Sequence, residues 1–242
     1  MGERVRVYVT TCDAYLPALR PFAWLLNKNW RPNPEVVVGG FTKPDFDLPS
    51  NFTFHSIGKQ EDYPFSKWTN AASKMITDLP DEVFVLMLED MWITRGVDTK
   101  AVQVLADYMH QFRYVARIDL TGDRLYAHGM RKYGSVAHLD LIVSMPGSPY
   151  HLSLMPGLWR KEHWLSVIQP DWTPWQVELQ GTPELSHKSR EMIVLGTRQW
   201  PIRNILALRG GDVGKLLLND IDETDVRELR RIVFLSHWEE EK

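Results

Sequence analysis

A run of six apolar residues, Val83 to Leu88, is the strongest hydrophobic pattern in the chain. It is bounded by polar residues and rich in Val and Phe, which is typical of a strand buried on both faces of a sheet. Glu89 and Asp90 follow at once, and unpaired charges do not belong inside such a strand. We therefore expect the two carboxylates at its carboxyl end, where open α/β sheets bind ligands.

Strand and helix patterns alternate on both sides of this run. Strands are predicted at 5–10, 35–40, 51–57 and 114–120, and helices at 15–27, 66–79 and 97–112. Asp13 and Ser66 stand at expected helix N-caps, and Asp98 lies near the start of the third helix. This order predicts an α/β fold with a mostly parallel sheet and helices on both faces.

The pattern weakens after Thr121, and the elements expected there are shorter. Residues 124–150 are polar and rich in Gly, whereas 159–168 predict a helix and 170–181 predict a turn that passes into a short helix. A strand-like run, ILALR, follows at 205–209. Residues 223–238 predict an amphipathic helix, which we expect to pack on the core.

Composition supports one large globular domain, since 44% of the 242 residues are apolar and 24% are charged. A net charge of -3 argues against broad non-specific binding of nucleic acid. Cys12 is the single cysteine, so no intrachain disulfide can form. No apolar run reaches the length of a membrane span. No apolar segment follows a basic N-terminus, as it would in a secretory signal. We therefore expect a soluble, cytoplasmic protein.

Carboxylates beside aromatic rings are the main candidates for chemistry. The chain has no zinc-spaced Cys/His pattern, no P-loop, no GxGxxG and no GxSxG. On a helix, Trp175 and Glu178 would share one face. A ring that excludes water raises the pKa of a carboxylate, which suits a general base. A solvated glutamate beside a core tryptophan is the alternative.

The first predicted strand leads into a polar segment, Thr10, Thr11, Cys12 and Asp13. Hydroxyls and a carboxylate at this place can bond a ribose or a base edge. Asp13 can instead cap the following helix, and both interpretations are compatible.

Six short segments, taken in their order along the chain, resemble motifs of the GT-A-type glycosyltransferases, specifically the small soluble group associated with polysaccharides and phages. The resemblance covers about residues 5–216. It rests on TTCDAY (10–15), SKWTNAASKMI (66–76), LMLEDMWI (86–93), YHLSLMPGLWRKEHWL (150–165), PWQVELQG (174–181) and VGK (213–215). It implies a GT-A-like (Rossmann-like) fold with a mixed, mostly parallel sheet flanked by helices. It also implies transfer of a sugar from a nucleotide-diphosphate-sugar to an acceptor hydroxyl.

The resemblance assigns roles along a single domain of residues 1–242. Residues 1–120 would bind the nucleotide-sugar, 121–218 would serve the acceptor and catalysis, and 219–242 would form a C-terminal helix. Glu178 would be the base of an inverting displacement, and Asp90 would act in catalysis near Mn²⁺ or Mg²⁺. The implied donor contacts are Thr10, Thr11, Asp13, Lys67, Glu89, Trp159, Trp175 and Lys215.

One departure concerns the metal. The acid-x-acid motif of this family places a second carboxylate two positions after the first, but Met91 and Trp92 follow the pair here. A hard dication prefers several oxygen ligands, so a metal is possible only if phosphates and waters complete its shell. Cations could stabilise the leaving diphosphate instead, and the candidates are Lys67, Arg117, Arg131 and Lys132.

Three alternatives stay open. The acceptor can be a glycan, a small molecule or a modified DNA base, and the basic, aromatic segment 124–132 could contact a phosphate backbone. The chain can also be a non-catalytic nucleotide-sugar-binding protein. A nucleotidyltransferase shares the α/β fold but normally has a Gly-rich, basic N-terminal loop, which TTCDAY is not. The sequence leaves the sugar, the nucleotide and the oligomeric state open.

Overall fold

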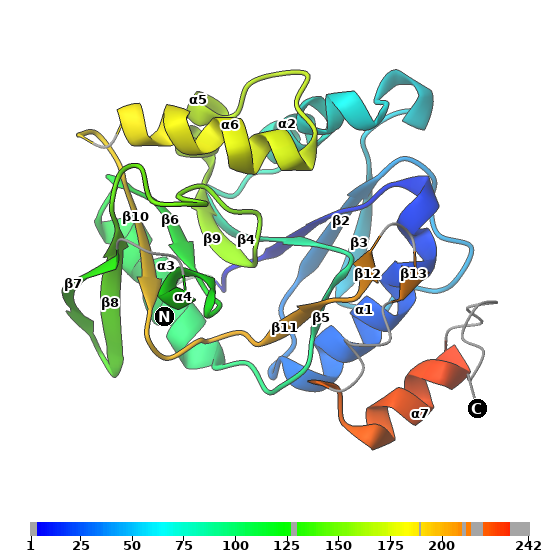
Figure 1. Cartoon of the computed structure of the whole chain (residues 1–242). Coiled ribbons are helices and arrows are strands. Elements are labelled where there is room, and N and C mark those ends of the chain that lie inside the picture. The colour runs from blue at the N-terminus through cyan, green and yellow to red at the C-terminus, as the bar shows by residue number, and fades with distance from the viewer. Residues whose placement is uncertain (1–3, 127–129, 189, 210–211, 214–219, 233–242) are drawn as a thin grey trace.

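The computed structural model describes residues 4–126, 130–188, 190–209, 212–213 and 220–232. Within them, nine strands form the main sheet in the order β3-β2-β1-β4-β9-β6-β10-β8-β7. The pairings make all of these strands except β8 and β9 run in one direction. The predicted mixed, mostly parallel α/β sheet is therefore confirmed (Figure 1).

The strands of the main sheet are β1 (Val7–Thr10), β2 (Val36–Gly40), β3 (Phe52–Ser56), β4 (Val83–Leu88), β6 (Val115–Asp119), β7 (Met130–Val136), β8 (Leu139–Ser144), β9 (Gly157–Arg160) and β10 (Ile193–Thr197). Short pairs are formed by β5 (Met91–Ile93) with β11 (Asn204–Leu206), and by β12 (Leu208–Arg209) with β13 (Asp212–Val213). The helices are α1 (Leu16–Asn29), α2 (Trp68–Asp78), α3 (Thr99–Gln111), α4 (Asp123–Tyr126), α5 (Lys161–Val167), α6 (Pro174–His187) and α7 (Glu223–Ile232). Single 3₁₀ turns are η1 (Asp13–Tyr15), η2 (Gln60–Asp62) and η3 (Phe65–Lys67).

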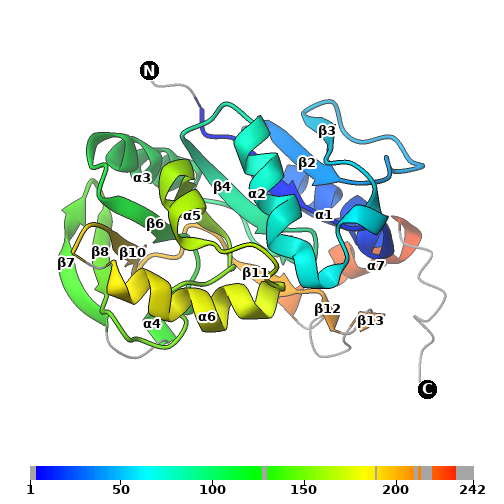
Figure 2. The same ribbon diagram turned by 90° about the horizontal axis from the view of Figure 1, so that it is seen from above.

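Helices cover both faces of the sheet, because alternate residues of the central strands point to opposite sides. Val83, Val85 and Met87 of β4 pack with α1 and α3, whereas Phe84 and Leu86 pack with α2, α5 and α6. Figure 1 shows the second group of helices above the sheet, and Figure 2 shows them in front of it. β4 is thus buried on both faces, as its continuous apolar run predicts.

The C-terminal helix packs on the core, as expected. Leu229 of α7 is buried in the cluster that contains α1, and Lys28 of α1 pairs with Asp225 of α7. The predicted continuation of this helix beyond residue 232 lies outside the described residues.

The sheet does not divide at residue 120. β9, from the second half of the chain, lies between β4 and β6 of the first half and is antiparallel to both. The two halves therefore share one core. A division of labour between donor and acceptor halves stays a prediction.

Several local predictions were wrong. Tyr15 and Lys67, not Asp13 and Ser66, stand at the N-caps of α1 and α2, and neither cap makes a side-chain hydrogen bond. Trp159 belongs to β9, and the helix after it begins only at residue 161. The β7–β8 hairpin and β10 were not predicted. Asp98, expected near the start of the third helix, is the N-cap of α3, and its side chain accepts from the Ala101 amide at 2.9 Å.

The loop after β6 is held against the β10–β11 connection by a close contact of Gly122. A Cβ at this position would lie 2.4 Å from a ring atom of Trp200. The ring is rigid and cannot yield as a flexible side chain would, so we expect Gly122→Ala to destabilise the fold by about 1–3 kcal/mol. Gly96→Ala is the matched control, because no described atom lies within 4 Å of its Cβ. Chemical denaturation measures both, and equal stability of the two variants would contradict the contact.

Candidate functional site

The carboxyl ends of three parallel strands, β1, β2 and β4, lie level and form one edge of the sheet, the carboxyl edge. Thr10 at the end of β1 pairs with Gly39 of β2 and with Leu88 of β4. Thr11 and Glu89 therefore leave the sheet side by side. This brings the polar segment after β1 next to the carboxylate pair after β4, as the sequence predicts.

The carboxylate pair is largely withdrawn from water. Glu89 is only 7% exposed, and burial together with the charge of Asp90 raises its pKa to about 8. Burial also raises the pKa of Asp90 to about 6. At pH 7 Glu89 is therefore mostly protonated, whereas Asp90 is mostly ionised. One site then holds a hydrogen-bond donor beside a negative charge.

Cys12, in the polar segment after β1, and Tyr15, which was not a predicted site residue, border the pair. Burial raises the pKa of the Cys12 thiol, and the charge of Glu89 adds to this effect. Burial likewise raises the pKa of Tyr15, and the charge of Asp90 adds to it. The loop between β1 and α1 thus encloses the carboxylates.

Two buried oxygens at this edge lack a hydrogen-bond partner among the described residues, namely Oγ1 of Thr10 and Oδ1 of Asp90. Buried polar atoms are normally bonded, so each such exception needs an explanation. A bound ligand, ion or water would satisfy both oxygens. They mark the part of the edge at which a polar ligand would be recognised.

Asp13 connects the loops around this edge and does not cap α1. Its carboxylate accepts from the Thr42 amide at 3.0 Å and from the Thr42 hydroxyl at 2.9 Å. Its own amide donates to Oε1 of Gln60 at 3.2 Å. Asp13 therefore braces the segment after β2 through its side chain and the segment after β3 through its backbone amide. A contact from Asp13 to a nucleoside stays a prediction.

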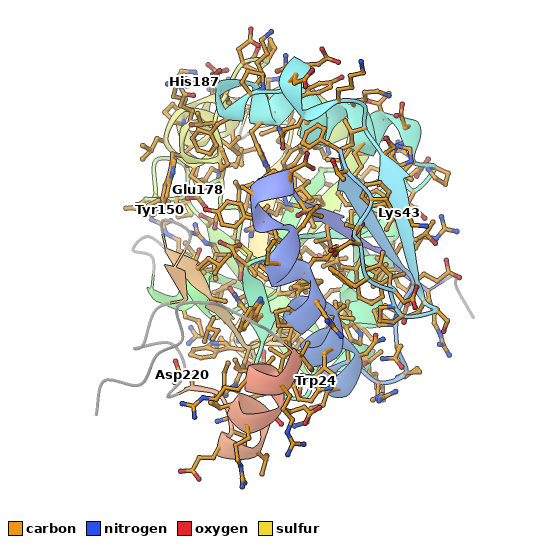
Figure 3. All side chains as sticks on the ribbon, turned by 90° about the vertical axis from the view of Figure 1, so that its right-hand side faces the viewer. Trp24, Lys43, Tyr150, Glu178, His187 and Asp220 are labelled. Atoms are coloured by element: carbon orange, nitrogen blue, oxygen red, sulfur yellow. The ribbon has the colours of Figure 1, made fainter. Side chains whose placement is uncertain are left out.

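Glu178 lies on α6, whose first turn is fixed by a reciprocal capping box between Thr173 and Gln176. Oε1 of Glu178 accepts from the Leu154 amide at 2.8 Å. Burial raises the pKa of Glu178, while this amide and the charge of Arg117 oppose the rise. Figure 3 shows Glu178 and Tyr150 on the same side of the molecule. The predicted base is thus oriented and partly desolvated.

Glu178 lies near the buried groups at the end of β6. Its carboxylate is bonded to Leu154, in the irregular segment that precedes β9. The charges of Arg117 and Asp123 both act on it. β9 runs antiparallel to β4, with Gly157 opposite Leu86. The placement of the base opposite the carboxylate pair stays a prediction.

A buried cluster of charged and polar groups at the end of β6 was not predicted. The guanidinium of Arg117 donates to Asp119 at 3.0 Å and to the Met155 carbonyl at 2.8 Å. Nδ1 of His151 lies 2.8 Å from the Ser144 hydroxyl, and burial lowers the pKa of His151 to about 4. His151 is therefore neutral at pH 7.

The two arginines of this cluster, Arg117 and Arg124, have no exposed surface. Glycines leave room for them, since a Cβ at Gly157 would lie 3.0 Å from the Arg117 guanidinium and one at Gly196 would lie 3.0 Å from Cβ of Arg124. Arg124 donates to Asp123 at 2.8 Å. A sequence signal existed: opposite charges two residues apart on one face of a predicted buried strand imply a buried pair.

These arginines correct two predictions. Arg117 is fully buried and bonded within the protein, so it is not available to a leaving diphosphate without rearrangement. Arg124 is also buried, so the segment 124–132 is not a continuous basic surface. Arg131 and Lys132 are exposed, but they lie on β7. This is an outermost strand of the sheet, and β9, β6, β10 and β8 separate it from β4. None of these cations reaches Asp90.

The remaining predicted site residues have different surroundings. Lys67 is exposed and ends η3, immediately before α2. Trp159 is 1% exposed and packs edge-on against Trp164 in the core, so a ligand cannot stack on it. Trp175 is largely exposed on α6. Lys215 lies outside the described residues.

Over the described part of the chain, no three His, Cys, Asp or Glu side chains form a group that could hold a metal ion. Oδ1 of Asp90 is the oxygen that fits a dication, because it is buried and has no partner among these residues. A metal would therefore need oxygens from a bound phosphate or from water. In the same part of the chain, no helix is long and apolar enough to cross a bilayer.

No protein-family model and no curated protein matches this chain. Among solved structures, CMP:2-keto-3-deoxy-manno-octonic acid synthetase complexed with CTP is similar, with a TM-score of 0.48 and 8% sequence identity. The alignment covers 95% of this chain and 100% of that chain. A likeness at this level carries no argument about family or activity.

The burial of Glu89 predicts a specific dependence of stability on pH. Its pKa rises from an ordinary 4.5 to about 8, so between these values the folded state holds a proton that the unfolded state releases. The free energy of unfolding then falls as pH rises, by about 1.4 kcal/mol per pH unit for one proton. We expect Glu89→Gln to remove this loss between pH 6 and pH 8.

Urea denaturation at several pH values measures the difference between the variant and the wild type. Glu61→Gln, at an exposed position, should keep the wild-type dependence. If Glu89→Gln and the wild type lose stability in parallel up to pH 8, Glu89 is ionised in the folded protein and the assignment is wrong.

Proposed function

We propose that this protein is a glycosyltransferase that moves a sugar from a nucleotide-diphosphate-sugar to an acceptor hydroxyl. The observation that carries the proposal is the carboxylate pair at the end of β4. Glu89 is buried, Oδ1 of the partly buried Asp90 has no hydrogen-bond partner among the described residues, and the pair lies beside the polar segment after β1. The motifs that resemble GT-A-type glycosyltransferases support the same assignment.

Glu89 and Asp90 would act on the donor. The protonated Glu89 can donate a hydrogen bond, and the ionised Asp90 can hold a ribose hydroxyl or a cation. A Mn²⁺ or Mg²⁺ ion held by Asp90, with diphosphate oxygens as further ligands, would supply positive charge to the leaving group. Thr10 offers a buried hydroxyl next to them. Lys67 and Lys215 stay candidate contacts of the phosphates.

Glu178 would act on the acceptor. As the bond to the diphosphate breaks, the anomeric carbon gains positive character, and the acceptor oxygen forms the new bond. Its proton passes to Glu178, whose raised pKa suits this transfer. The Leu154 amide holds Oε1 of this carboxylate, and the Ser153 side chain also hydrogen-bonds the group. A base placed opposite the leaving group predicts inversion at the anomeric carbon.

The exposed surface favours a sugar or small-molecule acceptor over modified DNA. The DNA alternative depended on the basic segment 124–132, in which Arg124 is buried and paired with Asp123. Affinity for duplex DNA requires several cations that face the phosphates together. This alternative therefore loses the feature that suggested it.

The role of Glu178 predicts the behaviour of Glu178→Gln. The amide keeps the size of the side chain and can still accept from Leu154, but it cannot take a proton. We expect donor affinity to stay within about twofold and turnover to fall by about 10²–10⁴, the usual contribution of a general base. Release of nucleoside diphosphate from a nucleotide-sugar, with and without added acceptor, measures turnover.

Glu184→Gln is the matched control, since Glu184 lies on the same helix and is also partly buried. It should retain wild-type turnover. A Glu178→Gln variant with unchanged turnover would remove Glu178 from the reaction.

A further inference from the structure

Large apolar side chains are exposed around Glu178. Trp175 is 69% exposed and Leu179 is 64% exposed, both on α6. Tyr150 is 51% exposed and has a left-handed backbone, with φ of 50°. Such a backbone is unusual for a bulky residue and often marks a functional position. Core packing explains none of these three side chains.

Helix geometry places Trp175 next to the base. At 100° per residue, Trp175 and Glu178 lie about 60° apart around α6 and one turn apart along it. Glu178 and Thr182 both face the chain segment 152–154, since Leu152 donates to Thr182 at 3.1 Å and Leu154 donates to Glu178 at 2.8 Å. Trp175 lies on the same face of α6 as these two residues, nearer to the N-terminus of the helix.

The start of α6 is held in place against α2. The Thr69 amide donates to the Trp172 carbonyl at 3.0 Å, and the Trp172 amide donates to the Thr69 hydroxyl at the same distance. The Asp171 amide donates to Asn70 at 2.7 Å. The ring of Trp175 is therefore presented from a fixed turn, which lowers the entropy lost when it binds a ligand.

The proposed role of Glu178 indicates which of the two substrates contacts the ring of Trp175. A general base must lie within hydrogen-bond reach of the hydroxyl that it deprotonates, so the acceptor occupies the outer side of Glu178. An aromatic ring one turn away is then in position to contact the acceptor. This differs from the prediction that Trp175 binds the donor.

Charge distinguishes among acceptors. α6, from Pro174 to His187, carries Glu178 and Glu184 and has neither Lys nor Arg. The helix therefore offers a phosphate-rich ligand no cationic side chain of its own. An uncharged sugar has an apolar ring face that stacks on an aromatic side chain and hydroxyls that bond a carboxylate.

We propose that Trp175 is the acceptor platform of this enzyme, on which an uncharged pyranoside stacks with one hydroxyl directed at Glu178. Tyr150, which lies on the same side of the molecule as Glu178 (Figure 3), supplies a second aromatic contact. This inference rests on the proposed transferase function, and it narrows the acceptor to a neutral glycan.

Direct binding tests the platform without any transfer reaction. The probes are methyl glycosides of glucose, galactose, mannose and N-acetylglucosamine, and their short β- and α-linked oligomers, titrated into the full chain and followed by NMR. We expect at least one probe to bind the wild type and to bind Trp175→Ala about tenfold more weakly. Trp175→Phe should recover most of the affinity, because it restores a ring.

Gln180→Ala is the control, since Gln180 is exposed on α6 but lies about 140° from Trp175 and about 160° from Glu178 around the helix. It should bind the probes as the wild type does. Equal affinity of Trp175→Ala and the wild type would overturn the platform, as would a failure of every glycoside to bind. Trp175-dependent binding of a single-stranded oligonucleotide would also overturn it.

The same variants separate this inference from the transferase function. Thermal stabilisation by nucleotide-sugars should be equal in the wild type and in Trp175→Ala. If nucleotide-sugars still bind but the affinity for glycosides does not depend on Trp175, the platform is wrong and the transferase function stands. If the wild type binds no nucleotide-sugar, the transferase function fails and the acceptor role of Trp175 fails with it.

Discussion

The site depends on the desolvation of two adjacent carboxylates at the end of β4, a strand that is packed on both faces. Glu89 and Asp90 leave β4 where the sheet has packed helices on both faces, so water cannot solvate both charges. The fold holds Glu89 as the neutral acid and leaves an oxygen of Asp90 without a partner among the described residues. A ligand with hydroxyls or cations would complete this arrangement, and the loop after β1 lies beside it.

The second part of the site depends on one chain segment, residues 152–155. Its backbone donates to Glu178 through Leu154 and accepts from Arg117 through Met155. The segment then enters β9, which lies between β4 and β6. The base on α6 and the buried arginine of β6 are therefore bonded to the same segment, and β4 pairs with the strand that follows it.

The sequence predicts those features that follow from local pattern. The limits of β4, the parallel strands before it and the Asp98 cap come from hydrophobic period and capping chemistry. The position of β9 and the hydrogen bond from Arg117 to the Met155 carbonyl depend on contacts between distant segments, which periodicity does not encode. Trp159 was misjudged for the same reason, because its burial is set by α5 and β6. The predicted N-cap at Asp13 was wrong because Thr42, 29 residues away, takes its carboxylate.

Binding of a nucleotide-sugar at the end of β4 is the central claim, and a thermal-shift panel tests it most directly. The panel compares nucleotide-diphosphate-sugars, free nucleoside triphosphates and free sugars, with and without Mn²⁺, on the wild type and on Asp90→Asn. A ligand at 100 times its Kd stabilises the folded state by about 2.7 kcal/mol. The account predicts that one nucleotide-sugar stabilises the wild type and that Asp90→Asn loses most of this effect. Stabilisation by nucleoside triphosphates alone, or equal stabilisation of both proteins, would contradict it.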